Sequence, residues 1–187
     1  EKVKISIDLM GGDNSPDKTL LGIDLFIKRN KNKNDYFFYL FGDENIVKKK
    51  ISKLKYLKSN YKLIDTKIVV SNELPPLAAL KKGKGSSMWE SIHSQISSKA
   101  DVTLSAGNTG VLLVMSKIIL KTMDGIDRPA LAGLWPNDKN MNIVLDLGAN
   151  IDCSEKNLID FSEMGSALYR SLFHNETAKV ALLNIGS

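Results

Sequence analysis

The spacing of apolar and polar residues alternates between a strand period and a helix period along this chain. Runs rich in β-branched and aromatic residues predict strands, which lie at 3–9, 36–41, 67–70, 101–105, 130–135, 142–147 and 179–185. Apolar residues at helical spacing predict helices at 16–28, 46–54, 86–98, 108–121 and 155–173. In the second helix, the side chains expected to face inward are Ile46, Val47, Ile51 and Leu54.

Strands that alternate with helices indicate an α/β protein whose mostly parallel sheet is covered by helices on both faces. A polar turn joins 130–135 to 142–147, so these two strands are expected to form an antiparallel pair. A chain of 187 residues, 43% of them apolar, predicts a single α/β domain over 1–187. Open sheets of this kind bind ligands at the carboxyl ends of their strands, where we therefore expect functional groups.

The formal net charge of +5 is concentrated in one segment. Between Lys28 and Lys67, twelve Lys and Arg residues against four Asp and Glu residues leave +8, so the remainder carries 5 − 8 = −3. One interpretation is the Lys- and Asn-rich composition of an AT-rich genome, and the other is a docking face for an acidic carrier protein or a membrane surface. Nucleic acid is not the expected partner, because only three Arg residues are present and no basic stripe carries aromatic residues.

Cysteine usage and hydropathy indicate a cytoplasmic protein. Cys153 is the only cysteine, which excludes an internal disulfide and suits a reducing compartment. No apolar stretch approaches the roughly 18 residues of a membrane span, and the N-terminus lacks the apolar core of a signal peptide. The spacing of Cys and His predicts no metal site, and no cofactor is expected. His93 lies between polar neighbours and is expected on the surface.

The sequence DLMGGD at 8–13 follows the first predicted strand. Gly11 and Gly12 permit a tight turn and a close approach of a ligand to the backbone, with Asp8 and Asp13 on either side. The two carboxylates are suited to ordering a basic side chain or a cation. The alternative is a plain strand-to-helix turn in which an Asp helps to cap the next helix.

The sequence KKGKGSS at 81–87 places three lysines before a helix start. Backbone N–H groups, the helix dipole and ammonium charges converge there, as an anion site requires. The alternative is a solvated lysine loop in which Ser86 or Ser87 only caps the helix.

The sequence SAGNTG at 105–110 connects an apolar strand to an apolar helix. Its small residues expose backbone N–H groups, and Asn108 or Thr109 can cap the helix or contact a ligand. A phosphate or a developing oxyanion fits such a turn, whereas the alternative is a tight, well-capped connection.

Two later segments repeat the combination of a polar residue and a strand end. Arg128, in GIDRP at 125–129, carries a guanidinium group that matches phosphate, or that pairs with Asp127 in a purely structural arrangement. The segment DLGAN at 146–150 places a carboxylate and a glycine after a strand, and 184–186 places Asn184 before a glycine.

Taken in order, DLMGGD, KKGKGSSM, SAGNTG, GIDRPA, LDLGAN and ALLNIG closely resemble the phosphate acyltransferase family known as PlsX, and the resemblance covers 3–187. The family often carries an acidic residue where Gly85 stands. Its members are longer than this chain, so a truncation at the C-terminus is expected.

The resemblance implies a three-layer α/β/α sandwich similar to isocitrate and isopropylmalate dehydrogenases and to phosphotransacetylase. It implies transfer of a fatty acyl group from acyl-[acyl-carrier protein] to inorganic phosphate, which gives acyl phosphate for phospholipid synthesis. It also implies a cytoplasmic homodimer, with peripheral membrane association through the missing part.

Phosphate is a competent nucleophile near neutral pH, so orientation and charge stabilisation are expected to matter more than a strong base. The expected residues are, as catalytic groups, Asn108, Lys84 and Arg128; as phosphate or substrate ligands, Lys82, Ser86, Ser87, Ser105, Gly107, Thr109 and Gly110; and, as supporting residues, Asp8, Gly11, Gly12, Asp13, Asp127, Asp146, Asn150 and Asn184. Among the supporting residues, Asp8, Asp13 and Asp146 are expected to hold the cations in position.

Two other functions remain open from the sequence. One is a short-chain phosphotransacylase that uses acyl-CoA, and the other is a non-catalytic fragment that binds phosphate or a partner. A nucleotide-dependent dehydrogenase is not expected, because the chain has no Gly-x-Gly-x-x-Gly loop.

Overall fold

The computed structural model describes residues 2–30, 32–71, 75–97, 99–138, 140–174 and 176–184. The chain forms two compact units, residues 1–121 and 122–187, which are described separately below. The single domain expected over 1–187 stays a prediction.

The first unit is built on a four-stranded parallel sheet with the strand order β3-β2-β1-β4. The strands are β1 (Val3–Asp8), β2 (Tyr36–Gly42), β3 (Tyr61–Asp65) and β4 (Val102–Ser105). The helices between them are α1 (Asp17–Arg29), α2 (Glu44–Ile51), α3 (Pro76–Lys82) and α4 (Ser87–Ile96), and α5 (Thr109–Leu120) follows β4. This arrangement confirms the predicted α/β class with a mostly parallel sheet.

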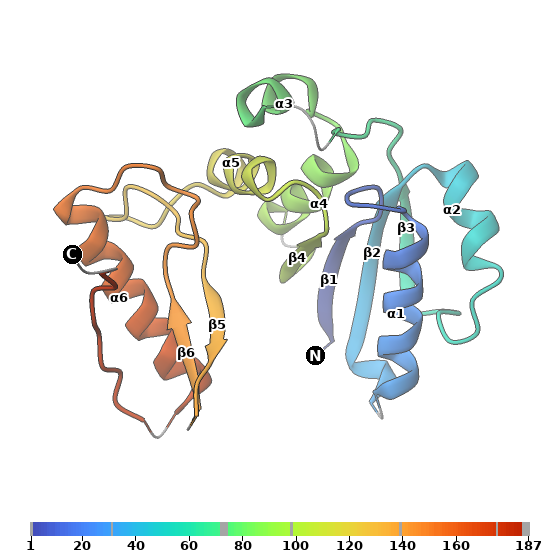
Figure 1. Ribbon diagram of the computed structural model, residues 1–187. Helices are drawn as coiled ribbons and strands as arrows, with labels where there is room; N and C mark the ends of the chain where they lie inside the picture. Colours follow the sequence, from blue (N-terminus) through green and yellow to red (C-terminus); the bar gives the residue numbers. More distant parts are fainter. Residues whose placement is uncertain are drawn as a thin grey trace. The chain divides into compact units, whose positions relative to one another are not determined.

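The two faces of β1 receive different partners because side chains alternate along a strand. Ile5 and Ile7 belong to the apolar core with the buried side chains of α1 and α2. Ser6 points to the opposite face, where its Oγ donates to the Ser91 carbonyl of α4 at 2.8 Å. Helices therefore cover both faces of the sheet, as in a three-layer α/β/α sandwich (Figure 1).

A second apolar core joins α3, α4 and α5 on the α4 side of the sheet. Its buried members are Ala79, Met88, Ile92, Val111, Met115 and Ile119. The N-caps of two of these helices are those that the sequence predicts. Ser86 Oγ accepts from the Trp89 N–H at 3.2 Å, and Asn108 Oδ1 accepts from the Val111 N–H at 3.1 Å.

The second unit contains an antiparallel pair and one long helix. The pair is β5 (Gly133–Pro136) with β6 (Met141–Val144), and the helix is α6 (Glu155–Leu172). The predicted antiparallel pair is therefore confirmed, although both strands are shorter than expected. A capping box between Ser154 and Asn157 begins α6. None of the helices in the described ranges is both long and apolar enough to span a membrane.

Several local predictions are wrong. The third strand is Tyr61–Asp65 and not 67–70, because 61–65 pairs with β2 over its whole length while Ile68 makes only an isolated bridge to Ser86. Residues 179–184 form no strand, since no strand of the described chain pairs with them. Ile46 is 41% exposed and does not face inward, unlike the buried Val47, Ile51 and Leu54.

Candidate functional site

Asp8, the last residue of β1, lies at the centre of a polar cluster in the first unit. The other members of this cluster are Met10, Gly11, Ser87 and Ser105. Its side chain is 1% exposed and accepts four hydrogen bonds. Oδ1 accepts from Ser87 Oγ at 2.6 Å and from the N–H groups of Met10 and Gly11 at 3.1 Å each. Oδ2 accepts from Ser105 Oγ at 2.7 Å. One carboxylate thus connects the turn after β1, the start of α4 and the end of β4.

This arrangement corrects the expected role of Asp8. The predicted carboxylate would hold a cation, but the four groups bound to it are two peptide N–H groups and two hydroxyls. Neutral donors satisfy the buried carboxylate, which would otherwise be costly to bury. The sequence gives no indication that Ser87 reaches Asp8, because the contact depends on how α4 packs on the sheet.

The turn after β1 and the turn after β4 approach each other closely. A methyl group on Gly11 would lie 2.4 Å from Asp8 Oδ2, 2.9 Å from the Gly107 nitrogen and 3.0 Å from Ser105 Oγ. Gly12 has a positive φ of +87°, and a methyl group there would lie 2.5 Å from the Ala106 carbonyl oxygen. The two predicted glycine turns are therefore parts of one structure, and neither Gly11 nor Gly12 has room for a side chain.

The start of α5 offers backbone donors beside this cluster. The Gly107 N–H donates to Ser105 Oγ at 3.1 Å, and the Val111 N–H is used by the Asn108 cap. Within the described part of the chain, no hydrogen bond uses the N–H groups of Thr109 and Gly110. These first-turn donors also lie at the positive end of the helix dipole, which suits an anion.

The lysine segment lies between α3 and α4 and has its own neighbours. A methyl group on Gly83 would meet Met115 and Val70, and one on Gly85 would meet Ile68. Lys82 and Lys84 are exposed, and neither forms an ion pair with the residues that the structure describes. Ser86, at the end of the segment, is buried and serves as the cap of α4. The segment thus presents exposed positive charge next to a capped helix start.

An apolar cavity of about 440 Å³ adjoins the cluster on the α1 side of the sheet. Its walls include Ile7, Phe26 and Leu104, and its lining also includes Asp8, Ser105 and Ala106 at the strand ends. Leu104 remains 52% exposed there because α4, the helix that packs on β4 in the described chain, covers the other face.

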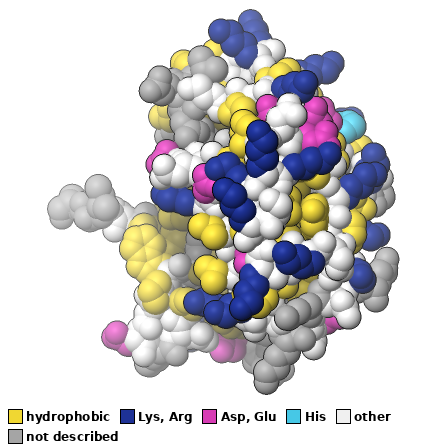
Figure 2. Space-filling model, turned by 90° about the vertical axis from the view of Figure 1, so that its right-hand side faces the viewer, with side chains coloured by type: hydrophobic (Ala, Val, Ile, Leu, Met, Phe, Trp, Pro, Cys, Tyr) yellow, Lys and Arg dark blue, Asp and Glu magenta, His cyan; other side chains and the backbone are white. Residues whose placement is uncertain are grey.

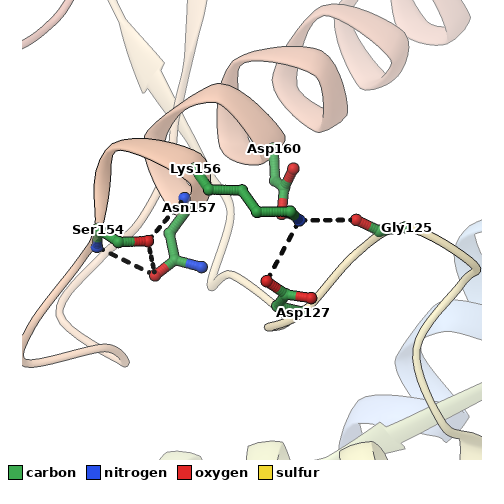
Figure 3. A network of polar contacts seen from close by, with 6 residues as sticks. All are labelled: Gly125, Asp127, Ser154, Lys156, Asn157 and Asp160. Atoms are coloured by element: carbon green, nitrogen blue, oxygen red, sulfur yellow. Dashed lines mark hydrogen bonds and ion pairs between the residues drawn. The ribbon is translucent and has the colours of Figure 1, made fainter.

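Five of the predicted residues lie in the second unit: Asp127, Arg128, Asp146, Asn150 and Asn184. Arg128 Nη1 donates to the Asp152 carbonyl at 2.9 Å. Asp127 pairs instead with Lys156 at 3.2 Å (Figure 3), so the alternative of a structural Asp127–Arg128 pair does not describe these residues. Asp146 accepts from the Leu131 N–H at 2.7 Å and from the Asn150 N–H at 2.6 Å, and therefore shapes a loop. The described donors to Asp146 are neutral, and its expected role of holding a cation stays a prediction.

Lys156 is a polar centre that sequence reasoning missed. Its ammonium group contacts Asp160 Oδ2 and the Gly125 carbonyl at 3.0 Å each, besides Asp127 (Figure 3). Hydrogen bonds that the Lys156 ammonium donates to Asp160, and then to Asp127, raise the pKa of Lys156 above its ordinary value of 10.5. The i, i+4 spacing of Lys156 and Asp160 on a predicted helix could have indicated this ion pair.

The remaining predicted residues have simpler surroundings. Asp13 is exposed and forms no ion pair with a described residue. Asn184 is exposed, while 185 and 186 of the same motif lie outside the described residues. His93 is exposed, as expected, and Cys153 is an exposed free thiol. No three His, Cys, Asp or Glu side chains gather as a metal site within the described ranges.

Comparison with known proteins identifies the family of this chain. The family described as "Fatty acid synthesis protein" matches residues 3–187. The phosphate acyltransferase of Pelagibacter ubique (strain HTCC1062) is 53% identical over 185 residues, which cover 99% of this chain and 54% of that protein. The phosphate acyltransferase of Rhizobium meliloti (strain 1021) is 43% identical, with 98% of this chain and 52% of that protein covered.

A solved structure shares the fold. EutD phosphotransacetylase from Staphylococcus aureus matches with a TM-score of 0.64 and 19% sequence identity, over 92% of this chain and 54% of that one. The chain spans about half the length of the curated relatives it matches. The PlsX resemblance is confirmed: the chain belongs to the fatty acid synthesis protein family, in which its curated relatives are named phosphate acyltransferases.

Proposed function

We propose that this chain is part of an enzyme that transfers a fatty acyl group from the thioester of acyl-[acyl-carrier protein] to inorganic phosphate. The observation that carries the proposal is the convergence of the 8–13 and 105–110 turns on Asp8, in a member of a family whose curated relatives are phosphate acyltransferases. Acyl transfer to phosphate requires donors that are held in place, and the Asp8 cluster orders the turn that leads to the N–H groups at the start of α5.

In the proposed reaction, phosphate lies at the start of α5 and receives hydrogen bonds from the N–H groups of Thr109 and Gly110. The exposed lysines Lys82 and Lys84 supply positive charge. The catalytic role expected for Arg128, which belongs to the second unit, stays a prediction. A phosphate oxygen attacks the thioester carbonyl carbon. The C–S bond then breaks, and the thiolate of the carrier leaves and takes up a proton. Asn108 stabilises the tetrahedral oxyanion, and the reaction proceeds without an acyl-enzyme intermediate.

The identity of the acyl donor distinguishes this proposal from its main alternative, a short-chain phosphotransacylase that uses acyl-CoA. Phosphate-dependent thiol release is measured with a long-chain acyl-[acyl-carrier protein] and with short-chain acyl-CoA. The assay uses this chain and a longer form that matches the length of the relatives. Preference for the carrier-bound donor supports the proposal, whereas preference for acyl-CoA supports a short-chain phosphotransacylase.

The same experiment decides whether this chain alone is catalytic. If only the longer form turns over, while this chain binds phosphate, the chain supplies the phosphate half of the site. If neither form releases thiol, the acyl-transfer proposal fails. We also propose a cytoplasmic homodimer with peripheral attachment to the membrane, which sedimentation velocity and vesicle co-sedimentation of the longer form would test.

A further inference from the structure

We infer that Asp8 is a positioning residue that sets the direction of the Gly107 peptide by acting through Ser105. The inference rests on the proposed function, because the turn that it orders leads into the proposed phosphate site. It changes the role of Ser105 from a phosphate ligand to a link between the buried carboxylate and the turn.

The Ser105 hydroxyl carries a single proton that it can donate. An ionised carboxylate only accepts hydrogen bonds, so the contact of 2.7 Å between Ser105 Oγ and Asp8 Oδ2 directs this proton toward Asp8. The lone pairs of Oγ remain available, and one of them accepts the Gly107 N–H at 3.1 Å. The carboxylate thus determines which way the hydroxyl points, and the hydroxyl determines where the Gly107 N–H points.

The donors of the 105–110 turn therefore differ in what they can bind. The Gly107 N–H is used internally and is not directed at a ligand. The next backbone donors without a described partner are those of Thr109 and Gly110. The Ser105 proton is likewise committed, so this hydroxyl cannot donate to phosphate at the same time. The backbone donors that this turn offers to phosphate are therefore the N–H groups at 109 and 110.

Ser87 provides a matched control within the same cluster. Its hydroxyl also donates to Asp8, at 2.6 Å, and its side chain is 2% exposed. Unlike Ser105, it has no described hydrogen bond to the 105–108 turn. Removing either hydroxyl takes one donor from Asp8, but only the loss of Ser105 releases the Gly107 peptide.

The first test needs no ligand. Amide hydrogen exchange of Gly107 is measured by NMR in the wild-type chain, Ser105→Ala and Ser87→Ala. Loss of one hydrogen bond should speed the exchange of Gly107 by roughly tenfold in Ser105→Ala and leave it unchanged in Ser87→Ala. Ser105→Thr keeps the hydroxyl and should restore slow exchange. Equal acceleration in the two alanine variants would overturn the inference, because Ser105 would then act only through general stability.

A double mutant shows whether Asp8 acts through Ser105. Asp8→Asn alone should speed the exchange of Gly107, but combined with Ser105→Ala it should add nothing further. Additive effects would mean that Asp8 reaches the turn by another route and would overturn the inference. If Ser105→Ala does not fold, Ser105→Cys replaces it, since a thiol is a weak donor and acceptor of similar shape.

The second test uses inorganic phosphate, followed through the amide signals of Thr109 and Gly110. Ser105→Ala should weaken phosphate binding about tenfold, and Ser105→Thr, which keeps the hydroxyl, should restore it. Unchanged phosphate affinity in Ser105→Ala would contradict the inference. If the wild-type chain binds no phosphate while the exchange pattern of Gly107 is as expected, the proposed phosphate site fails and the positioning role of Asp8 stands.

Discussion

Gly11 and Gly107 lie so close together that a methyl group on Gly11 would be 2.9 Å from the Gly107 nitrogen. The two residues come from different strand ends, and both belong to turns that bind Asp8 directly or through Ser105. This contact makes the candidate site a packed structure. Substitutions at these two glycines should change both the free energy of unfolding and the binding of phosphate.

Gly11→Ala should destabilise the chain by about 1–3 kcal/mol, because the added carbon would overlap the Asp8 carboxylate and the Gly107 backbone. The matched control is Gly22→Ala in α1, where a methyl group would meet nothing within 4 Å. This control should stabilise the chain by about 0.5–1 kcal/mol through helix propensity. Urea denaturation measures both, and a loss of stability in Gly22→Ala similar to that in Gly11→Ala would contradict the steric argument.

Asn108→Asp should separate helix capping from phosphate binding. Asp and Asn cap helices about equally well, so the free energy of unfolding should change by less than about 0.5 kcal/mol. The new negative charge beside the start of α5 should weaken phosphate binding by about tenfold or more. Isothermal titration with inorganic phosphate checks this expectation.

Asn108→Ser serves as the uncharged control, since it retains a capping oxygen. It should bind phosphate within about threefold of wild type. Unchanged phosphate affinity in Asn108→Asp would place the phosphate away from the start of α5.

Lys156 should titrate above its ordinary pKa of 10.5 in the folded chain, because Asp160 and Asp127 stabilise its charged form. The stability linked to this raised pKa is fully present below the unfolded pKa and is lost as pH rises through the folded pKa. Asp160→Asn should lower the pKa of Lys156 more than Asp127→Asn, since the Asp160 hydrogen bond is the larger cause. NMR titration of the lysine side chain measures the order, and the reverse order would refute the assignment.

The basic segment from Lys28 to Lys67 should bind acyl carrier protein through long-range charge if it is a docking face. Lys and Arg side chains are spread over the face shown in Figure 2, with hydrophobic groups between them. Lys50 is already paired with Asp17 at 2.6 Å, whereas Lys49 and Lys53 are exposed and have no described ion pair. Removing the charge of Lys49 or Lys53 should therefore slow association more than Lys50→Gln.

Stopped-flow association at increasing salt concentration gives the measurement for this segment. The rate should fall steeply with salt, since exposed charges are screened over about 10 Å at 0.1 M ionic strength. A flat response would leave compositional bias as the explanation of the lysines.

Local chemistry explains what the sequence by itself determined. The period of apolar residues predicts α1, β2, α5 and α6, because a face must be apolar to be buried. The caps are predicted to within one residue, as Ser86 or Ser87 and as Asn108 or Thr109, since a helix start needs an acceptor nearby in sequence. Six motifs in order also predicted the family.

Tertiary structure alone decided how these motifs meet. Ser87 and Asp8 are far apart in sequence, and only the packing of α4 on the sheet brings the hydroxyl to 2.6 Å from the carboxylate. Strand assignment failed at 67–70 for the same reason, because an apolar run becomes a strand only when a neighbouring strand accepts its hydrogen bonds. Burial of Asp8 among neutral donors likewise depends on three turns at once, which no local pattern encodes.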